Sequence, residues 1–278
     1  MVVSVSRRCD IPRYQFKWFM NRINEGYVVA VNPFNANQQK RIPLLPLKEG
    51  MDSSEGVDLI VFWTRNPRNI LNNADELERR GLRFYVMTTV TGYPIELEPG
   101  MIRTGKAIAA MKDLAQKTGP DRVIWRYDPV ILSNLTDGDF HRKNFASLAQ
   151  QLSGSVRRVI ISIYDEYPKT KQRFDRLEKF GTLKLLDNTC PAELLADMAH
   201  MAGEAGMEIQ SCASKEDFSA YGIKGGACID GELIKKLWGI ELSGKDKNQR
   251  PCCLCGKSVD IGAYGLCAAH CTYCYAWS

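Results

Sequence analysis

Short apolar runs alternate with amphipathic stretches over most of the chain. The apolar runs are rich in β-branched residues, as is typical of strands that are buried on both faces. They predict strands at residues 2–5, 27–31, 59–62, 84–88, 123–125, 159–163 and 208–210. Apolar residues recur at helical spacing between these runs, and they predict helices near residues 13–24, 70–80, 100–117, 140–152, 191–205 and 231–237.

Seven alternations of strand and helix favour parallel strands joined by right-handed crossovers. We therefore expect an α/β fold, a single TIM-like β/α barrel that is either complete or incomplete and circularly permuted. No proline- or serine-rich linker divides the chain, and residues 35–54 and 243–251 are expected to be exposed polar loops. We assign residues 1–242 to the barrel and residues 243–278 to a cysteine-rich C-terminal segment that packs on it as part of the same domain.

Composition and charge fit this picture. The 278 residues are 45% hydrophobic and 25% charged, which is ordinary for a soluble globular protein. No apolar run approaches the roughly 18–20 residues of a membrane span, and the start lacks a secretory signal, so we expect a cytoplasmic protein without a membrane partner. The net charge of +5 permits an anionic substrate without the dense basic footprint typical of nucleic-acid binding. Phosphate-binding loops, dinucleotide-binding glycine motifs and nucleophilic serine elbows are absent from the sequence.

Polar residues follow the predicted strands, and in an α/β barrel those strand ends form the active-site face. The candidates at these positions are Arg7, Arg8, Asn32, Trp63, Arg65, Tyr93, Arg126 and Asp128. Arginine suits bidentate contact with a carboxylate or phosphate, and the alternative is ion pairing inside the mouth with Asp10, Asp128, Asp165 or Glu166.

Other side chains carry weaker hypotheses. Trp63, Trp125 and Tyr127 could stack on a base, although aromatic residues near strand ends are more often part of the core. Asp128 or Asp260 could bind a ribose hydroxyl. Tyr93 or Tyr164 could donate a hydrogen atom.

Ten cysteines are many for a reducing compartment, which favours metal binding or redox chemistry over disulfides. Cys267, Cys271 and Cys274 end the chain with the spacing Cys-x-x-x-Cys-x-x-Cys. Three thiolates can hold three irons of a cubane cluster and leave the fourth iron open. The alternatives are a structural zinc site, with a fourth ligand from residues 252–255, and an iron–sulfur site with a redox role only.

A second set of cysteines comprises Cys212, Cys228, Cys253 and Cys255. Four thiolates could form a closed centre for zinc or for an auxiliary iron–sulfur cluster. Cys190 or Cys252 could replace one member. The alternative is that these cysteines are buried small hydrophobic residues.

The last dozen residues resemble the radical S-adenosylmethionine (radical SAM) superfamily. Its motif, Cys-x-x-x-Cys-x-aromatic-Cys, is matched by Cys267, Cys271, Tyr273 and Cys274. The superfamily usually carries this motif near the start of its barrel, so its position here implies that the first barrel strand comes last, near residues 258–264. Residues 271–275 also resemble the cluster loop of spore photoproduct lyase.

Nearly the whole chain resembles an uncharacterised domain-of-unknown-function family with a C-terminal, radical-SAM-like cysteine cluster. The matching phrases are residues 6–12, 32–34, 62–67, 126–129, 227–230, 245–246, 249–250 and 258–264. Position 9 is commonly threonine in that family, so Cys9 is given no ligand role.

The resemblance implies a radical SAM enzyme in which a 4Fe-4S cluster reductively cleaves S-adenosylmethionine (SAM) and starts radical chemistry on an unidentified substrate, a small molecule or a nucleic acid. It also implies an electron donor such as a flavodoxin or ferredoxin. The candidates for cofactor binding are Tyr273, Arg7, Arg8, Asn32, Trp63 and Arg65. The catalytic candidates are Arg126, Asp128 and Tyr93.

Overall fold

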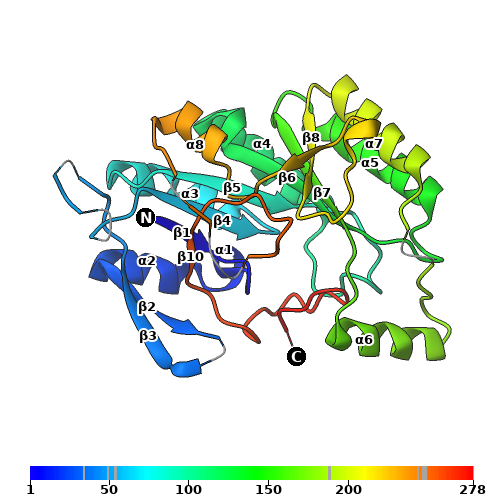
Figure 1. The fold of residues 1–278 in the computed structure, drawn as a ribbon, viewed down its shortest axis with the longest axis horizontal. Coiled ribbons are helices and arrows are strands. Elements are labelled where there is room, and N and C mark those ends of the chain that lie inside the picture. The colour runs from blue at the N-terminus through cyan, green and yellow to red at the C-terminus, as the bar shows by residue number, and fades with distance from the viewer. Residues whose placement is uncertain are drawn as a thin grey trace.

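The centre of the molecule is a sheet of eight parallel strands (Figure 1). The computed structural model describes residues 1–33, 35–48, 50–52, 55–186, 189–242, 244–245 and 249–277. The strands of the sheet are β1 (Val2–Val5), β4 (Leu59–Thr64), β5 (Phe84–Thr89), β6 (Val123–Val130), β7 (Arg158–Ile163), β8 (Glu208–Cys212), β9 (Lys224–Gly226) and β10 (Val259–Asp260). Their order is β10-β1-β4-β5-β6-β7-β8-β9.

Helices occupy most connections between the strands. They are α1 (Ile11–Tyr14), α2 (Phe16–Glu25), α3 (Arg68–Arg79), α4 (Thr104–Thr118), α5 (Gly138–Leu152), α6 (Pro168–Lys179), α7 (Ala192–Glu204) and α8 (Gly231–Trp238), with short 3-10 turns at Pro120–Arg122 and Ser219–Tyr221. The predicted α/β fold with parallel strands is confirmed. The described strands form a row that ends at β10 and β9, without the pairing that would close a barrel.

Each central strand packs on both faces. On β4, Ile60 and Phe62 belong to the large core cluster that also contains the apolar faces of α2, α3, α4, α5 and α7. Leu59, Val61 and Trp63 point the other way, into a second cluster with the apolar residues of α8. All six residues of β4 are buried, which is why the strand begins with an unbroken run of five apolar residues.

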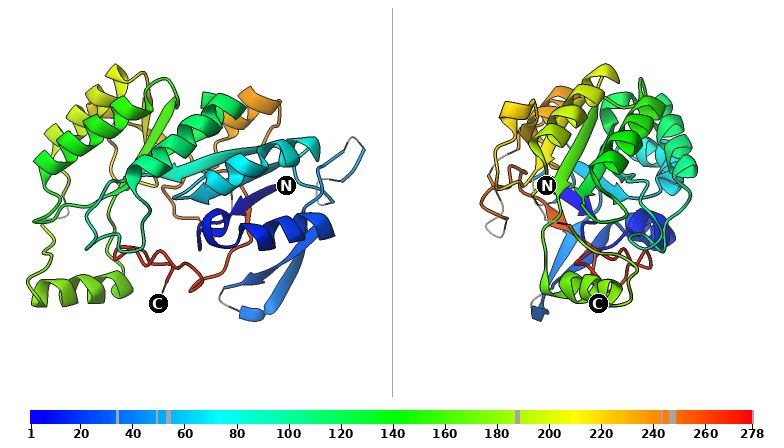
Figure 2. Two further views of the ribbon diagram at one scale, coloured as in Figure 1. Left: turned by 180° about the vertical axis from the view of Figure 1, so that it is seen from behind. Right: turned by 90° about the vertical axis from the view of Figure 1, so that its right-hand side faces the viewer.

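The predicted strand at 27–31 does not belong to this sheet. It is β2 (Tyr27–Asn32), which pairs antiparallel with β3 (Asn35–Pro43) in a hairpin that projects from the rest of the molecule (Figures 1 and 2). The prediction of a parallel strand was therefore wrong, as was that of a loop over residues 35–43. Val29 and Val31 are 45% and 44% exposed, so β-branched composition alone did not indicate burial on both faces.

Three other elements lacked a strong sequence pattern. Helix α6 buries only Thr170 and Phe174, so it carries almost no apolar stripe. Strand β9 is three residues long and contains two glycines. Strand β10 lies next to β1 at one end of the sheet, where the sequence predicted a last strand near residues 258–264. None of the helices in the described ranges is long and apolar enough to cross a membrane.

A buried histidine makes stability depend on pH. The side chain of His141 is fully buried, and its Nδ1 and Nε2 atoms lie 2.8 Å from Tyr127 Oη and 2.9 Å from the Ile131 carbonyl oxygen. Burial lowers the pKa of His141 from 6.5 to about 4. The unfolded chain therefore binds the proton first as the pH falls, and stability that is fully present above pH 6.5 is lost toward pH 4.

We expect this group to remove about 3 kcal/mol of unfolding free energy between pH 7 and pH 4, because each pKa unit corresponds to about 1.4 kcal/mol. Urea denaturation at both pH values measures the loss. His141→Gln should show a correspondingly smaller pH dependence than the original protein. If the unfolding free energies of both proteins depended equally on pH, titratable groups other than His141 would cause the loss.

Candidate functional site

The C-terminal segment after β10 runs along the carboxyl ends of the strands, between α1 and α6 (Figures 1 and 2). It docks on the loop after β5 through backbone hydrogen bonds, from Thr272 N to Leu97 O at 2.9 Å and from Gly100 N to Ala269 O at 3.1 Å. A Cβ atom at Gly100 would lie 2.3 Å from the Ala269 carbonyl oxygen, so this approach requires glycine. The cysteine loop is thus held against the strand ends.

Asp260 on β10 fixes the start of this segment to the end of β1. Its carboxylate accepts hydrogen bonds from Ser4 Oγ at 2.9 Å, Ser6 Oγ at 2.6 Å, Arg7 N at 2.8 Å and Gly262 N at 2.9 Å. The sequence analysis named Asp260 as a candidate to bind a ribose hydroxyl, but four donors of the protein already engage its carboxylate. Its observed contacts are those of an anchor between the two ends of the chain.

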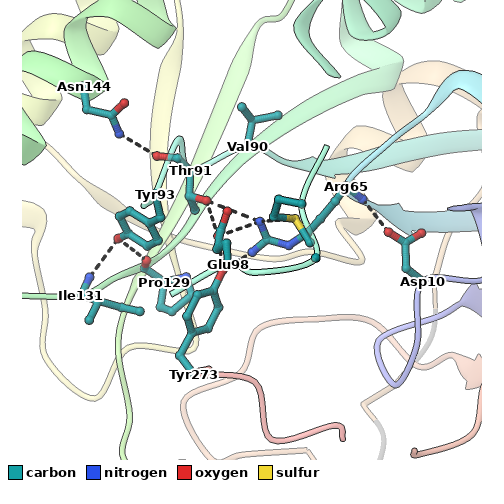
Figure 3. Close-up of polar contacts among 12 residues, drawn as sticks. Asp10, Arg65, Val90, Thr91, Tyr93, Glu98, Pro129, Ile131, Asn144 and Tyr273 are labelled. Carbon is teal, nitrogen blue, oxygen red and sulfur yellow. Dashed lines mark hydrogen bonds and ion pairs between the residues drawn. The ribbon is translucent and has the colours of Figure 1, made fainter. Parts of the chain in front are cut away.

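A second anchor joins Tyr273 of the cysteine motif to Arg65 after β4 and to Glu98 after β5 (Figure 3). Glu98 Oε1 lies 2.8 Å from an Arg65 guanidinium nitrogen and also accepts from the hydroxyls of Thr91 and Tyr273. The Arg65 backbone N–H donates to Asp10 at 2.9 Å. Burial by itself lowers the pKa of Arg65, but Glu98, Tyr273 and Cys271 together outweigh burial and raise it well above the usual value. The Arg65 guanidinium therefore stays charged.

Tyr93 packs against the same loop. Its hydroxyl donates to the Pro129 carbonyl at 2.7 Å and accepts from Ile131 N at 3.0 Å, and its ring packs edge-on against Tyr273 at 6.2 Å (Figure 3). Burial raises the pKa of Tyr93 well above the usual value. The hydroxyl predicted to donate a hydrogen atom is thus engaged in holding two backbone positions. Tyr164, the other such candidate, makes a 2.6 Å hydrogen bond to Thr170.

The three terminal cysteines lie in an apolar cluster with Tyr93 and Tyr273. Burial raises the pKa of the Cys271 thiol to about 12; Arg65 lowers this pKa, and the neighbouring thiols of Cys274 and Cys267 raise it. All three thiols are therefore within electrostatic range of one another. Burial favours the neutral thiol, whereas the nearby positive charge of Arg65 favours the thiolates that a bound cluster would need.

Backbone groups of the loop are held by side chains from its surroundings. Arg173 on α6 donates to the Cys274 carbonyl at 2.7 Å and to the Cys271 carbonyl at 3.4 Å. Trp277 Nε1 donates to the Cys271 carbonyl at 2.7 Å. Sequence reasoning missed Arg173 because it lies on a helix without an apolar stripe.

In the parts of the chain that the structure describes, no three His, Cys, Asp or Glu side chains are arranged as a group that could hold a metal ion. The thiolates of a four-iron cluster each bind a different iron, so such a set does not need three sulfurs around one ion.

The second cysteine set meets at the ends of β8 and β9. Cys212 Sγ lies 3.2 Å from Cys228 Sγ, and Cys255 Sγ accepts hydrogen bonds from Cys228 N at 3.2 Å and Ile229 N at 3.4 Å. Hydrogen bonds from the thiols of Cys228 and Cys253 lower the pKa of Cys255. The structure therefore brings together the four predicted cysteines.

The two cysteines offered as substitutes lie differently. Cys252 Sγ donates to the Ala213 carbonyl at 3.2 Å, and Cys190 packs against the helix-side core. The contacts between thiols thus involve Cys212, Cys228, Cys253 and Cys255, and metal binding by them stays a prediction.

Two arginines flank Trp63 beside this thiol set. The guanidinium carbons of Arg7 and Arg126 lie 5.3 and 4.9 Å from the Trp63 ring centroid. Arg126 forms an ion pair with Asp128, as the ion-pairing alternative predicted, whereas Arg7 donates to Ser258 Oγ at 2.6 Å. Arg7 Nε, Arg126 Nε and Trp63 Nε1 are buried without a hydrogen-bond partner among the described residues. Three unused donors here could receive an anionic group.

The remaining candidates lie away from these contacts. Asn32 belongs to the β2–β3 hairpin and donates to Gln38 at 2.7 Å, so it does not follow a strand of the parallel sheet. Arg8 donates to the Gly262 carbonyl at 3.3 Å and lies over Tyr264 at 5.5 Å. Trp125 and Tyr127 are fully buried core residues, as their alternative predicted. Phe34 and Asp246, which belong to the matching phrases, lie outside the described residues, as do Ser54 and Ser243 of the predicted loops and Ser278.

Glu98 is a second residue of the site that the sequence analysis missed. It sits in a loop between a strand and a helix and follows no periodic pattern. The sequence around it, Glu98-Pro99-Gly100, is typical of an exposed turn and does not indicate a buried carboxylate.

The comparisons with known proteins give a family but no activity. No curated protein matches the chain. A triazine hydrolase variant of known structure is 14% identical over 62% of this chain and 45% of its own, with a TM-score of 0.31. A pneumococcal exo-β-D-N-acetylglucosaminidase is 10% identical over 77% of this chain and 53% of its own, with a TM-score of 0.28. The chain spans about half the length of these structures, and similarities this low carry no argument.

A family profile described as a domain of unknown function (DUF1848) matches residues 2–276. The predicted membership of an uncharacterised family is therefore confirmed. Because the match covers nearly the whole sequence, this protein belongs to the DUF1848 family.

Proposed function

We propose that this protein is a radical SAM enzyme whose cluster loop follows the last strand of a circularly permuted β/α barrel. The observation that carries the proposal is the position of β10. This strand pairs in parallel with β1, and the loop that follows it carries the three cysteines to the carboxyl ends of the sheet. In α/β folds that face carries the chemistry.

In this proposal Cys267, Cys271 and Cys274 bind three irons of a 4Fe-4S cluster. When bound, the cluster and SAM supply the reductive cleavage that starts radical chemistry, with an electron from a flavodoxin or ferredoxin. Tyr273, Arg65 and Glu98 hold the loop in place, and Arg173 holds the carbonyls of Cys271 and Cys274. The positive charges of Arg65 and Arg173 offset the negative charge of the thiolates.

The substrate in this proposal carries a carboxylate or phosphate. Arg7 and Arg126 flank Trp63 and leave three buried donors unused, and a guanidinium suits bidentate contact with such a group. Asp128 holds Arg126 in place through its ion pair and accepts from Ser162. The pair orients the guanidinium toward the substrate.

Electron paramagnetic resonance of the anaerobically reconstituted, dithionite-reduced protein tests the proposal. We expect a four-iron signal whose shape changes when SAM is added, because SAM binds the open iron. A signal that ignores SAM would support a redox-only cluster. A colourless protein that holds zinc tightly at these cysteines would overturn the proposal in favour of a structural site.

A further inference from the structure

We propose that Cys212, Cys228, Cys253 and Cys255 form a second, four-thiolate metal centre, distinct from the terminal cysteine loop. Its ligand would be a soft thiophilic metal, zinc or a closed iron–sulfur cluster. The inference does not depend on the proposed SAM chemistry, because none of its four thiols belongs to the terminal motif.

Convergence in space is the first observation. The thiols come from three separate segments: the end of β8, the turn before α8, and the loop before β10. Cys212 Sγ and Cys228 Sγ are 3.2 Å apart, and the thiols of Cys228 and Cys253 both contact that of Cys255. Cys228 and Cys255 are only 2% and 3% exposed. Isolated buried cysteines pack as small hydrophobic residues, but packing alone does not explain four thiols from three segments that are linked by successive contacts.

The surroundings suit negatively charged sulfur. Two backbone N–H groups, those of Cys228 and Ile229, donate to Cys255 Sγ. The guanidinium of Arg7 lies within electrostatic range of Cys228 and Cys255, and that of Arg126 within range of Cys212 and Cys228. Four thiolates around a divalent ion leave a net charge of −2, which the two nearby guanidinium groups would partly offset. Hydrogen bonds and charges around the sulfurs are the usual outer support of thiolate metal sites.

The thiols form a row of pairwise contacts, from Cys212 to Cys228 to Cys255 to Cys253. Among the described residues no three of these side chains surround one point, so metal binding would have to turn them from this row onto one centre. Cys252 is adjacent in sequence and directs its thiol to the Ala213 carbonyl, so it provides a matched control.

Metal analysis of the full-length protein tests the inference. Cys267, Cys271 and Cys274 are first replaced together by alanine, so that all remaining metal reports on the second set. After anaerobic purification and reconstitution we expect about one zinc, or about four irons with a SAM-insensitive signal, per chain. Adding Cys253→Ser to this background should reduce the metal content at least about tenfold, whereas adding Cys252→Ser should leave it unchanged.

Cobalt binding to the metal-free protein gives a second readout that does not rely on any variant folding. Intense sulfur-to-cobalt charge-transfer absorption, at a level expected for four thiolates, supports the centre. Absence of metal and of this absorption from a folded protein would overturn it, as would metal content that is unaffected by Cys253→Ser. Loss of the SAM-sensitive signal in the terminal triple variant concerns only the proposed function, so the two proposals fail separately.

Discussion

Replacing Cys271 with alanine is expected to abolish reductive cleavage of SAM. Cys271 is the central thiol of the terminal motif, 5% exposed and within electrostatic range of Cys267 and Cys274. Two thiolates hold a cubane cluster far less well than three, and even changes outside a ligand set cost about 10–100-fold in metal affinity or activity. We therefore expect release of 5′-deoxyadenosine to fall by more than about 100-fold.

Anaerobic assay of 5′-deoxyadenosine by liquid chromatography, beside iron analysis, measures this loss. Cys190→Ala is the matched control, because Cys190 packs against the helix-side core and belongs to neither cysteine set. The control should retain iron and activity. Full iron content and activity in Cys271→Ala would show that the terminal motif does not hold the catalytic cluster.

Replacing Glu98 with alanine is expected to cost about 3–5 kcal/mol of unfolding free energy. Glu98 is 6% exposed, and its carboxylate accepts hydrogen bonds from Arg65, Thr91 and Tyr273. Its removal leaves the Arg65 guanidinium buried without its counter-charge, and the Tyr273 hydroxyl loses its acceptor. Because Tyr273 belongs to the cysteine motif, iron retention should fall together with stability.

Urea denaturation and iron analysis measure the two effects. Glu96 lies two residues away and contacts the cysteine segment through its backbone carbonyl, so Glu96→Ala removes a charge and keeps that contact. The control should stay within about 0.5 kcal/mol of the original protein. The double variant Arg65→Met/Glu98→Leu should be less destabilised than Glu98→Ala, since removing both charges leaves none unpaired. A loss below about 1 kcal/mol in Glu98→Ala would contradict the anchoring role.

Arg7 links the two cysteine regions. Its guanidinium lies over Trp63 beside Cys228 and Cys255, and it is also within electrostatic range of Asp260 and Tyr275 in the C-terminal segment. A substrate anion held by Arg7 and Arg126 would therefore lie between the second thiol set and the terminal loop. The two proposed metal sites would then lie on either side of the substrate, although they share no cysteine ligand.

The sequence by itself determined the elements whose burial is nearly complete. All six residues of β4 are buried, and five of the six in β5 are, so local composition carries their assignment. It failed for β2, where Val29 and Val31 are nearly half exposed in a hairpin, and for α6, whose charged surface hides its two buried residues. Those elements are stabilised by partners that a local window does not contain.

The terminal motif could also be identified from sequence, because its three cysteines and Tyr273 lie within eight consecutive residues. The role of Tyr273 could not, since its hydroxyl meets Glu98 across 175 positions of sequence. Tertiary structure likewise decided which thiols meet. Cys212 and Cys228 approach to 3.2 Å, whereas Cys252, which is next to Cys253 in sequence, directs its thiol to the Ala213 carbonyl. The local sequence pattern indicates which residues are buried. The contacts between distant segments depend instead on the parallel strands, which bring their carboxyl ends to one edge of the sheet.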